Sequence, residues 1–72
     1  MKFRYFADTD SLYINLADRP SSESEEVSPG VVIDYDEAGR IVGLDIQHAS
    51  QIVDLSRLEA HALPVESVEM SK

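Results

Sequence analysis

The side chains of this sequence that could do chemistry are mostly carboxylates, and Asp34 and Asp45 have the most suggestive placement. Both fall on the polar side of predicted β-strands, close to Gly43, where two carboxylates could share acid–base work. Such work requires at least one pKa moved toward neutrality by burial or by a nearby like charge. A chain of 72 residues has little room for an enclosed pocket unless an oligomer interface forms it. A solvated surface is therefore the favoured interpretation, and a site between subunits that uses Asp34, Asp45 or His48 is the alternative.

The spacing of the residues gives weaker support for a metal site or for a catalytic nucleophile. The run over residues 34–37 resembles the start of a calcium loop, but Ala38 stands at the fifth position, where an oxygen ligand is required. His48 and His61 stand thirteen residues apart, without a His-Glu-x-x-His arrangement, so they predict no zinc site. The serines of residues 21–24 lack a neighbouring base. We therefore expect no metal and no cofactor, and a non-enzymatic role is favoured over an enzymatic one.

The candidate interface consists of three side chains on the polar side of the first predicted hairpin, Arg4, Phe6 and Tyr13. If a helix covers only the other side of the sheet, two aromatic rings and an arginine lie in water. These residue types are enriched at the centres of protein interfaces. The alternative is that a tail or the segment 65–70 covers them.

Charge limits the classes of partner. The chain has 14 acidic and 6 basic residues, a net charge of −8. Binding of nucleic acid requires a basic surface, so direct contact with DNA or RNA is not expected. An acidic surface suits solubility, or docking on a basic protein partner. No apolar run reaches membrane-spanning length, and the N-terminus lacks the apolar region of a signal peptide, so we expect a cytoplasmic protein without membrane contact.

Size points to self-association. Residues 1–72 are expected to form a single small domain, and the absence of cysteine excludes disulfides and thiolate zinc sites. A core this small seldom supplies more than about 3–5 kcal/mol without such a staple. Association with further copies of the chain is the remaining way to stabilise the fold. The expected state is therefore a homo-oligomer, with a dimer favoured.

The first of two predicted hairpins occupies residues 1–16. Apolar and polar residues alternate on both sides of a turn rich in Asp and Thr, in which Asp8 and Asp10 are ordinary turn formers. Antiparallel partners must share a face, which centres the turn between Asp8 and Thr9. The apolar pairs are then Met1 with Leu16, Phe3 with Ile14, and Tyr5 with Leu12.

The second predicted hairpin occupies residues 31–46. The same argument centres its turn between Ala38 and Gly39, where glycine can supply a positive φ, with Glu37 and Arg40 as a flanking charge pair. The apolar pairs are then Val31 with Ile46, Ile33 with Leu44, and Tyr35 with Val42.

The remaining segments complete an α+β fold. Residues 18–26 predict a polar loop, and residues 25–27 a short acidic edge strand. Helical spacing predicts a helix over about residues 50–62, or a short turn followed by a helix from about 55, ended by Pro64. Residues 65–70 predict a weak last strand or an ordered tail. We therefore expect an antiparallel β-sheet of four to five strands, built from two hairpins, with a C-terminal helix packed on one face.

Three runs of the sequence carry a family resemblance. They are Y-x-x-x-x-D-x-L-Y-I over residues 5–14, P-G-V-x-x-D-Y-D over residues 29–36 and G-R-I-V-G-L-D-I over residues 39–46. The chain, over roughly residues 3–53, resembles a family of short prokaryotic proteins catalogued only as a domain of unknown function. The resemblance implies no activity and no catalytic residues.

Some members of that family look like the smaller partner in two-gene modules of the toxin–antitoxin type, which the resemblance implies are protein-binding neutralisers. We therefore expect a small non-enzymatic protein-interaction module of unassigned biochemical role. Its more specific form is an antitoxin-like partner of a basic protein. The acidic surface would steer the encounter, and Phe6 and Tyr13 would anchor it.

Overall fold

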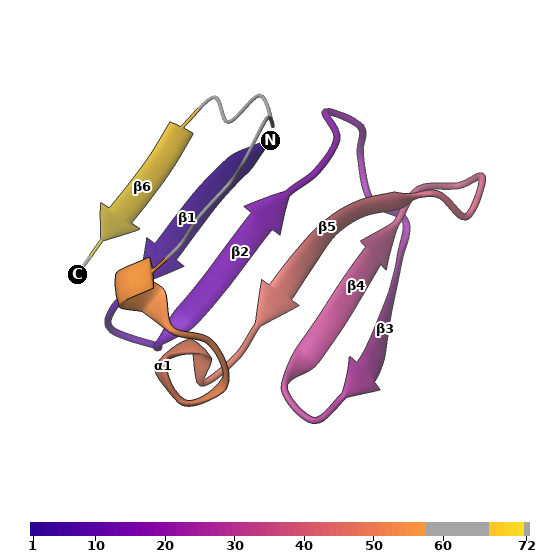
Figure 1. The fold of residues 1–72 in the computed structure, drawn as a ribbon. Coiled ribbons are helices and arrows are strands. Elements are labelled where there is room, and N and C mark those ends of the chain that lie inside the picture. The colour runs from indigo at the N-terminus through magenta and orange to yellow at the C-terminus, as the bar shows by residue number, and fades with distance from the viewer. Residues whose placement is uncertain (58–66, 72) are drawn as a thin grey trace.

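A computed structural model describes residues 1–57 and 67–71 (Figure 1). Six strands form one sheet, and two short helical segments follow the fifth strand. The strands are β1 (Lys2–Phe6), β2 (Ser11–Asn15), β3 (Glu23–Ser28), β4 (Val31–Tyr35), β5 (Ile41–Ile46) and β6 (Ser67–Ser71). The helical segments are α1 (Ala49–Ile52) and the 3₁₀ turn η1 (Leu55–Arg57).

The sheet has the order β3-β4-β5-β2-β1-β6. Its first five strands are antiparallel, as the two hairpins predict, and β3 confirms the predicted acidic edge strand. The expected count of four to five strands is one too few for the whole sheet. The last segment forms β6, which pairs in parallel with β1 (Figure 1).

The register of the first hairpin is confirmed at its two central apolar pairs. Phe3 lies opposite Ile14 and Tyr5 opposite Leu12. The third expected pair, Met1 with Leu16, lies beyond the ladder, which starts at Lys2. The Leu16 N–H instead donates to the Val42 carbonyl at 2.8 Å, so the chain after β2 is held by β5.

The second hairpin has the predicted register only at its open end. Val31 lies opposite Ile46 and Ile33 opposite Leu44, but the pairing of Tyr35 with Val42 is wrong, because the register shifts and Tyr35 faces Ile41. Val42 is the extra residue of a β-bulge, and its carbonyl accepts the N–H groups of Leu16 and Ala17 at 2.8 and 3.1 Å. The turn closes through Asp36 N–H to the Arg40 carbonyl at 2.9 Å, and Gly39 has the predicted positive φ of 80°.

The helical part is shorter than predicted. α1 has four residues and ends at Ile52, and the extended backbone of the C-cap residue Val53 (φ −124°, ψ 156°) interrupts the helical pattern. Asp54 then begins a new turn, because its Oδ1 accepts both the Ser56 N–H at 3.1 Å and the Ser56 hydroxyl at 2.6 Å. The rest of the expected helix, residues 58–62, lies outside the described residues. None of the helices in the described part is both long and apolar enough to span a bilayer.

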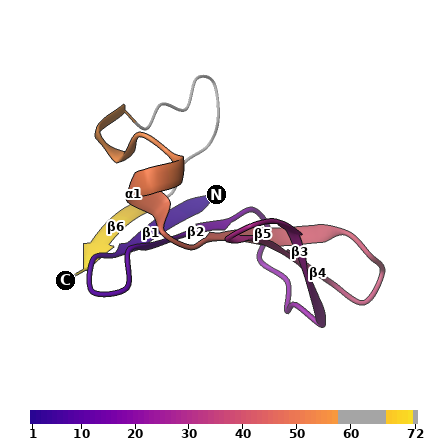
Figure 2. The same ribbon diagram turned by 90° about the horizontal axis from the view of Figure 1, so that it is seen from below.

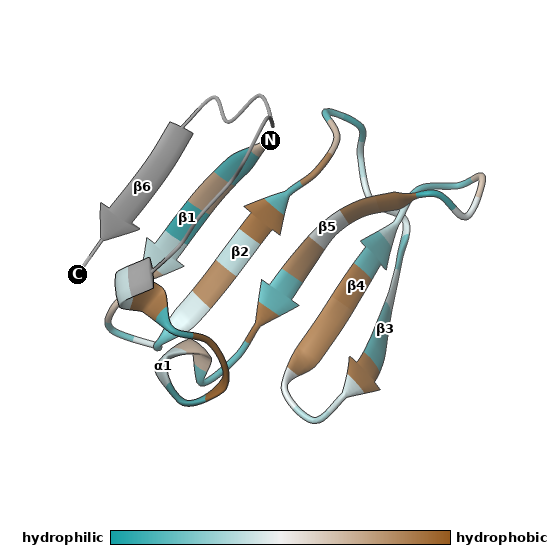
Figure 3. Ribbon diagram, in the orientation of Figure 1, coloured by the Kyte–Doolittle hydropathy of each residue, from teal (hydrophilic) through white to brown (hydrophobic). Residues whose placement is uncertain are grey.

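The core is small and lies at one end of the sheet. Leu12, Ile46 and Ala49 form its buried cluster, and the half-buried side chains of Tyr5, Ile14, Val53 and Leu55 pack against it. α1 therefore covers the apolar face beside β1 and β2 (Figure 2). Apolar residues continue across β5 and β4 (Figure 3), where neither α1 nor η1 lies over the sheet.

Candidate functional site

The three candidate interface residues lie on the polar face of the sheet, opposite the core cluster. Arg4 pairs with Tyr13 and Phe6 pairs with Ser11 in the β1–β2 ladder. Arg4 is exposed, whereas Phe6 and Tyr13 are half-buried. The structure thus places the three residues side by side. Tyr13, however, is not the fully solvated ring that the sequence led us to expect, because its hydroxyl is hydrogen-bonded. The Tyr13 hydroxyl donates to Asp34 Oδ2 at 3.0 Å, across the intervening strand β5.

Gly43 provides the space for this crossing. It lies between Asn15 of β2 and Asp34 of β4 in the two ladders, directly beneath the Tyr13 ring. A Cβ atom at this position would overlap the Tyr13 hydroxyl and lie 2.7 Å from the ring carbon that bears it. Glycine therefore leaves the space that the Tyr13 ring needs to reach Asp34. Its isolated position in the interior of a predicted strand was the sequence signal for such an approach.

Asp34 connects three strands across the polar face. Its Oδ2 accepts the Tyr13 hydroxyl from β2, and its Oδ1 accepts the Ser24 hydroxyl from β3 at 2.6 Å. Asp45 lies opposite Tyr13 on β5, so both predicted carboxylates and the tyrosine form one cluster. The structure thus brings Asp34 and Asp45 together as the sequence predicts, and adds Tyr13 to them.

The cluster perturbs the proton affinity of two of its members. Burial, and secondarily the charge of Asp34, raises the pKa of Asp45 above its ordinary value. Burial also raises the pKa of Tyr13, with further contributions from the hydrogen bond to Asp34 and from the charges of Asp34 and Asp45. The arrangement therefore places the carboxylates of Asp34 and Asp45 beside the ring of Tyr13. Such a surface is chemically complementary to cationic groups.

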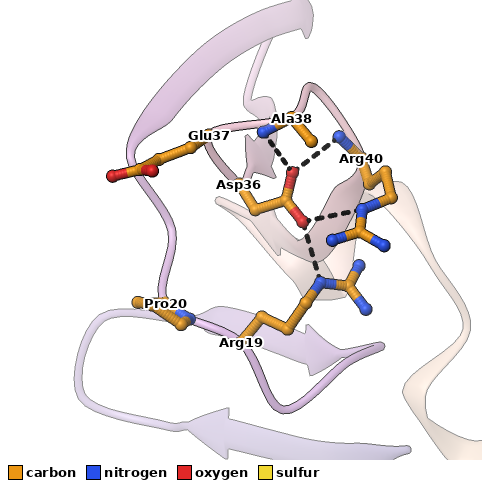
Figure 4. A pocket seen from close by; sticks show the side chains of 6 residues that line it. All are labelled: Arg19, Pro20, Asp36, Glu37, Ala38 and Arg40. Atoms are coloured by element: carbon orange, nitrogen blue, oxygen red, sulfur yellow. Dashed lines mark hydrogen bonds and ion pairs between the residues drawn. The ribbon is translucent and has the colours of Figure 1, made fainter.

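A second cluster surrounds Asp36, whose exposed fraction is only 7% (Figure 4). Asp36 Oδ1 accepts the N–H groups of Ala38 and Arg40, each at 2.9 Å. Asp36 Oδ2 accepts Arg19 Nε at 2.8 Å and Arg40 Nε at 3.1 Å. The backbone hydrogen bond from Arg40 is the largest of the contacts that lower the pKa of Asp36, followed by the bonds from Arg19 and Ala38.

This cluster borders a hollow of about 390 Å³, which we call the arginine hollow. Its lining residues are Arg19, Pro20, Asp36, Glu37, Ala38 and Arg40. Sequence reasoning missed it. The expected charge pair of Glu37 with Arg40 is replaced by the ion pair of Asp36 with Arg40, because Asp36 faces into its own turn. The available signal was an aspartate two residues before the Ala38-Gly39 turn, a position from which its carboxylate can bond the turn backbone.

A third cluster, around Asp10, is a structural link between the first hairpin and α1. Asp10 has a positive φ of 52° and accepts the Tyr5 hydroxyl at 2.7 Å and the Ser50 hydroxyl at 2.7 Å. It also accepts the Ser50 N–H at 3.1 Å, so it caps α1. His48 stands at the N-cap position without a side-chain cap bond. The hydrogen bond from the Ser50 side chain is the largest contact that lowers the pKa of Asp10.

The other candidates give no site. His48 is exposed, and His61 lies outside the described residues. The described part of the chain contains no group of three or more histidines or carboxylates placed to hold a metal ion.

Comparison with known proteins gives one match. No curated protein and no solved structure is significantly similar to the chain. Residues 2–50 match the model of a family described as "Protein of unknown function (DUF2283)". This segment contains β1 to β5, and with them the Tyr13, Asp34 and Asp45 cluster and the arginine hollow. Because the match covers more than half of its length, the chain belongs to this family of unknown function.

Proposed function

We propose that this protein is a non-enzymatic protein-interaction module that self-associates through its apolar sheet face and binds a basic protein partner through its polar face. The observation that carries the proposal is a line of four apolar side chains across four strands. Consecutive ladder pairs place Phe3, Ile14, Leu44 and Ile33 in this line, which we call the apolar row.

The apolar row supports self-association because its members are only half-buried. Leu12, Val42, Ile46 and Ala49 are the buried apolar residues of the described part, which is a small core for a sheet of six strands. A second copy placed on the row would remove the same apolar residues from water in both subunits, as a twofold interface does. The outer edge is unsuited to this role, since every residue of β3 is exposed and the strand contains three glutamates, which discourage strand-to-strand pairing.

The polar face supports binding of a basic partner. Asp34 and Asp45 flank Tyr13 at its centre, and Glu26 lies farther out on the exposed strand β3. Such a surface attracts a cationic protein over a distance, and an aromatic residue at its centre then supplies contact area. In its more specific form, the proposal is that the protein neutralises a small basic protein encoded by a neighbouring gene.

Co-expression with the product of the neighbouring gene tests this function. We expect the two proteins to co-purify, and Asp45→Lys to abolish co-purification by placing a cation beside Tyr13. Glu37→Lys makes the same change of charge outside the polar face, and it should leave the complex intact. Co-purification that survives Asp45→Lys, or the failure of every neighbouring product to bind the folded wild-type protein, would contradict the proposal.

A second candidate function is a ligand-binding or catalytic site formed between subunits at Tyr13, Asp34 and Asp45. The raised pKa of Asp45 favours it, because acid–base chemistry uses such a group. This function requires a second subunit to close over the polar face. It therefore predicts that Asp45→Lys, rather than a charged residue in the apolar row, disrupts the oligomer.

A further inference from the structure

The arginine hollow places two cations together in a strongly acidic protein. Arg19 and Arg40 are two of only 6 basic residues in a chain of net charge −8. Both Nε atoms donate to the same carboxylate oxygen of Asp36, at 2.8 and 3.1 Å, so the Nε atoms lie within about 6 Å of each other. Two guanidinium groups at this separation repel one another, and Asp36 offsets the charge of only one.

Asp36 uses only the Nε donor of each arginine in this pair. Arg19 Nη2 donates to the Ile41 carbonyl at 3.3 Å. Among the described residues, Arg19 Nη1 and both terminal nitrogens of Arg40 have no protein acceptor. The Arg40 side chain is 65% exposed and that of Arg19 is 37% exposed. The two arginines and Asp36 therefore present several N–H groups and one net positive charge at one place, and Glu37 brings the lining as a whole to no net charge.

The surroundings of the pair suit an anion with an attached group. Glu37 also lines the hollow, but its carboxylate points away from both guanidinium groups (Figure 4). Pro20 and Ala38 contribute apolar wall. A volume of about 390 Å³ is in the range of small-molecule sites.

We propose that Arg19 and Arg40 bind the phosphate group of a small phosphate monoester in the arginine hollow. A phosphate dianion has three terminal oxygens and can accept hydrogen bonds from two guanidinium groups at once. Asp36 positions the pair by holding each Nε, which leaves Arg19 Nη1 and both terminal nitrogens of Arg40 for the ligand. The hollow is lined by the β4–β5 turn and by Arg19 and Pro20, and its lining includes neither the Tyr13, Asp34 and Asp45 cluster nor the apolar row.

Titration of the full-length protein, followed by NMR signals of the Ala38 and Arg40 amides and of the arginine Nε–H groups, tests the site. The probes are phenyl phosphate, inorganic phosphate and acetate, each at constant ionic strength maintained with sodium chloride. We expect saturable shifts with phenyl phosphate and weaker binding of acetate. Equal affinity for phenyl phosphate and inorganic phosphate would assign the site to free phosphate. Affinity for acetate equal to that for both phosphates would overturn the phosphate assignment.

Variants separate a built site from general attraction of anions. Arg40→Gln should weaken phenyl phosphate binding about tenfold or more, since it removes charge-assisted hydrogen bonds. Glu37→Gln should strengthen binding, because it removes a negative charge from the lining and no contact of Asp36. Lys2→Gln is the control for lost positive charge on the distant strand β1, and it should bind as the wild type does. NMR shifts that do not saturate with phenyl phosphate would refute the proposal. Equal affinity of Arg40→Gln and Lys2→Gln for phenyl phosphate would refute it as well.

Discussion

The close contact of the Tyr13 ring with Gly43 predicts that a larger residue at position 43 displaces the ring from the polar face. In Gly43→Ala, the new Cβ would occupy the space of the Tyr13 hydroxyl and crowd the Ile14 carbonyl at 3.1 Å. The backbone carbonyl cannot move without disturbing the β2–β5 ladder, but the ring can swing toward solvent. We therefore expect Tyr13 to leave its position and to lose its hydrogen bond to Asp34.

The expected loss of stability follows from these contacts. Loss of a hydrogen bond to a charged group costs about 1.5–3 kcal/mol, and the half-exposed position of Tyr13 favours the lower end. Crowding by the extra carbon adds about 1 kcal/mol or more. Replacing a strand glycine by alanine returns about 0.5–1 kcal/mol. The net change in the free energy of unfolding is therefore a decrease of about 1–3 kcal/mol.

A double-mutant cycle measures whether the loss of stability in Gly43→Ala is caused by displacement of Tyr13. Urea unfolding, followed by circular dichroism at one fixed protein concentration, gives the free energy of unfolding of the wild type, of Gly43→Ala, of Tyr13→Ala and of the double variant. We expect Gly43→Ala to be nearly neutral in the Tyr13→Ala background, a coupling of about 2 kcal/mol. Gly39→Ala is the control, because nothing lies within 4 Å of its added carbon and its strain comes from φ alone, so it should not couple to Tyr13. A destabilisation by Gly43→Ala that is equal in both backgrounds would refute the proposed contact.

Three further predictions concern stability. Leu12→Ala, at a side chain only 1% exposed, should cost about 2–5 kcal/mol and leave little folded protein by circular dichroism. The lowered pKa of Asp36 stabilises the fold above the pKa of the unfolded chain, and this contribution disappears as pH falls through the lower folded value. Asp36→Asn should therefore reduce the acid loss of stability in urea titrations at several pH values. The raised pKa of Asp45 acts in the opposite direction: its penalty grows as pH rises from the unfolded value through the folded value. Asp45→Asn should therefore raise the urea midpoint at neutral pH and leave it unchanged at a pH below both values.

The parts of the fold that depend on alternation were predictable. Phe3 with Ile14 and Ile33 with Leu44 follow from the two-residue period, because a slip of one residue would expose a whole apolar set. The bulge at Val42 was not predictable, since it depends on hydrogen bonds from Leu16 and Ala17, which follow β2.

The candidate site was predictable only where it depends on the alternation of residues along a strand. Strand alternation alone places Asp34 and Asp45 on one face, but only the order of the strands brings Tyr13 to them across Gly43. The bond from Arg19 to Asp36 joins residues 17 positions apart through the course of a loop, which carries no periodic signal. The early end of α1 likewise depends on a local competition, in which Asp54 bonds Ser56 instead of continuing the helix.

The molar mass of the protein in solution tests most directly whether a second copy covers the apolar row. Sedimentation equilibrium of the wild type and of Leu44→Glu, with folding checked by circular dichroism, is the measurement. We predict a wild-type mass of twice the 8.0 kDa chain, and a shift to the monomer mass in Leu44→Glu but not in the polar-face variant Asp45→Lys. A wild-type protein that is cooperatively folded and monomeric throughout the micromolar range would contradict the account.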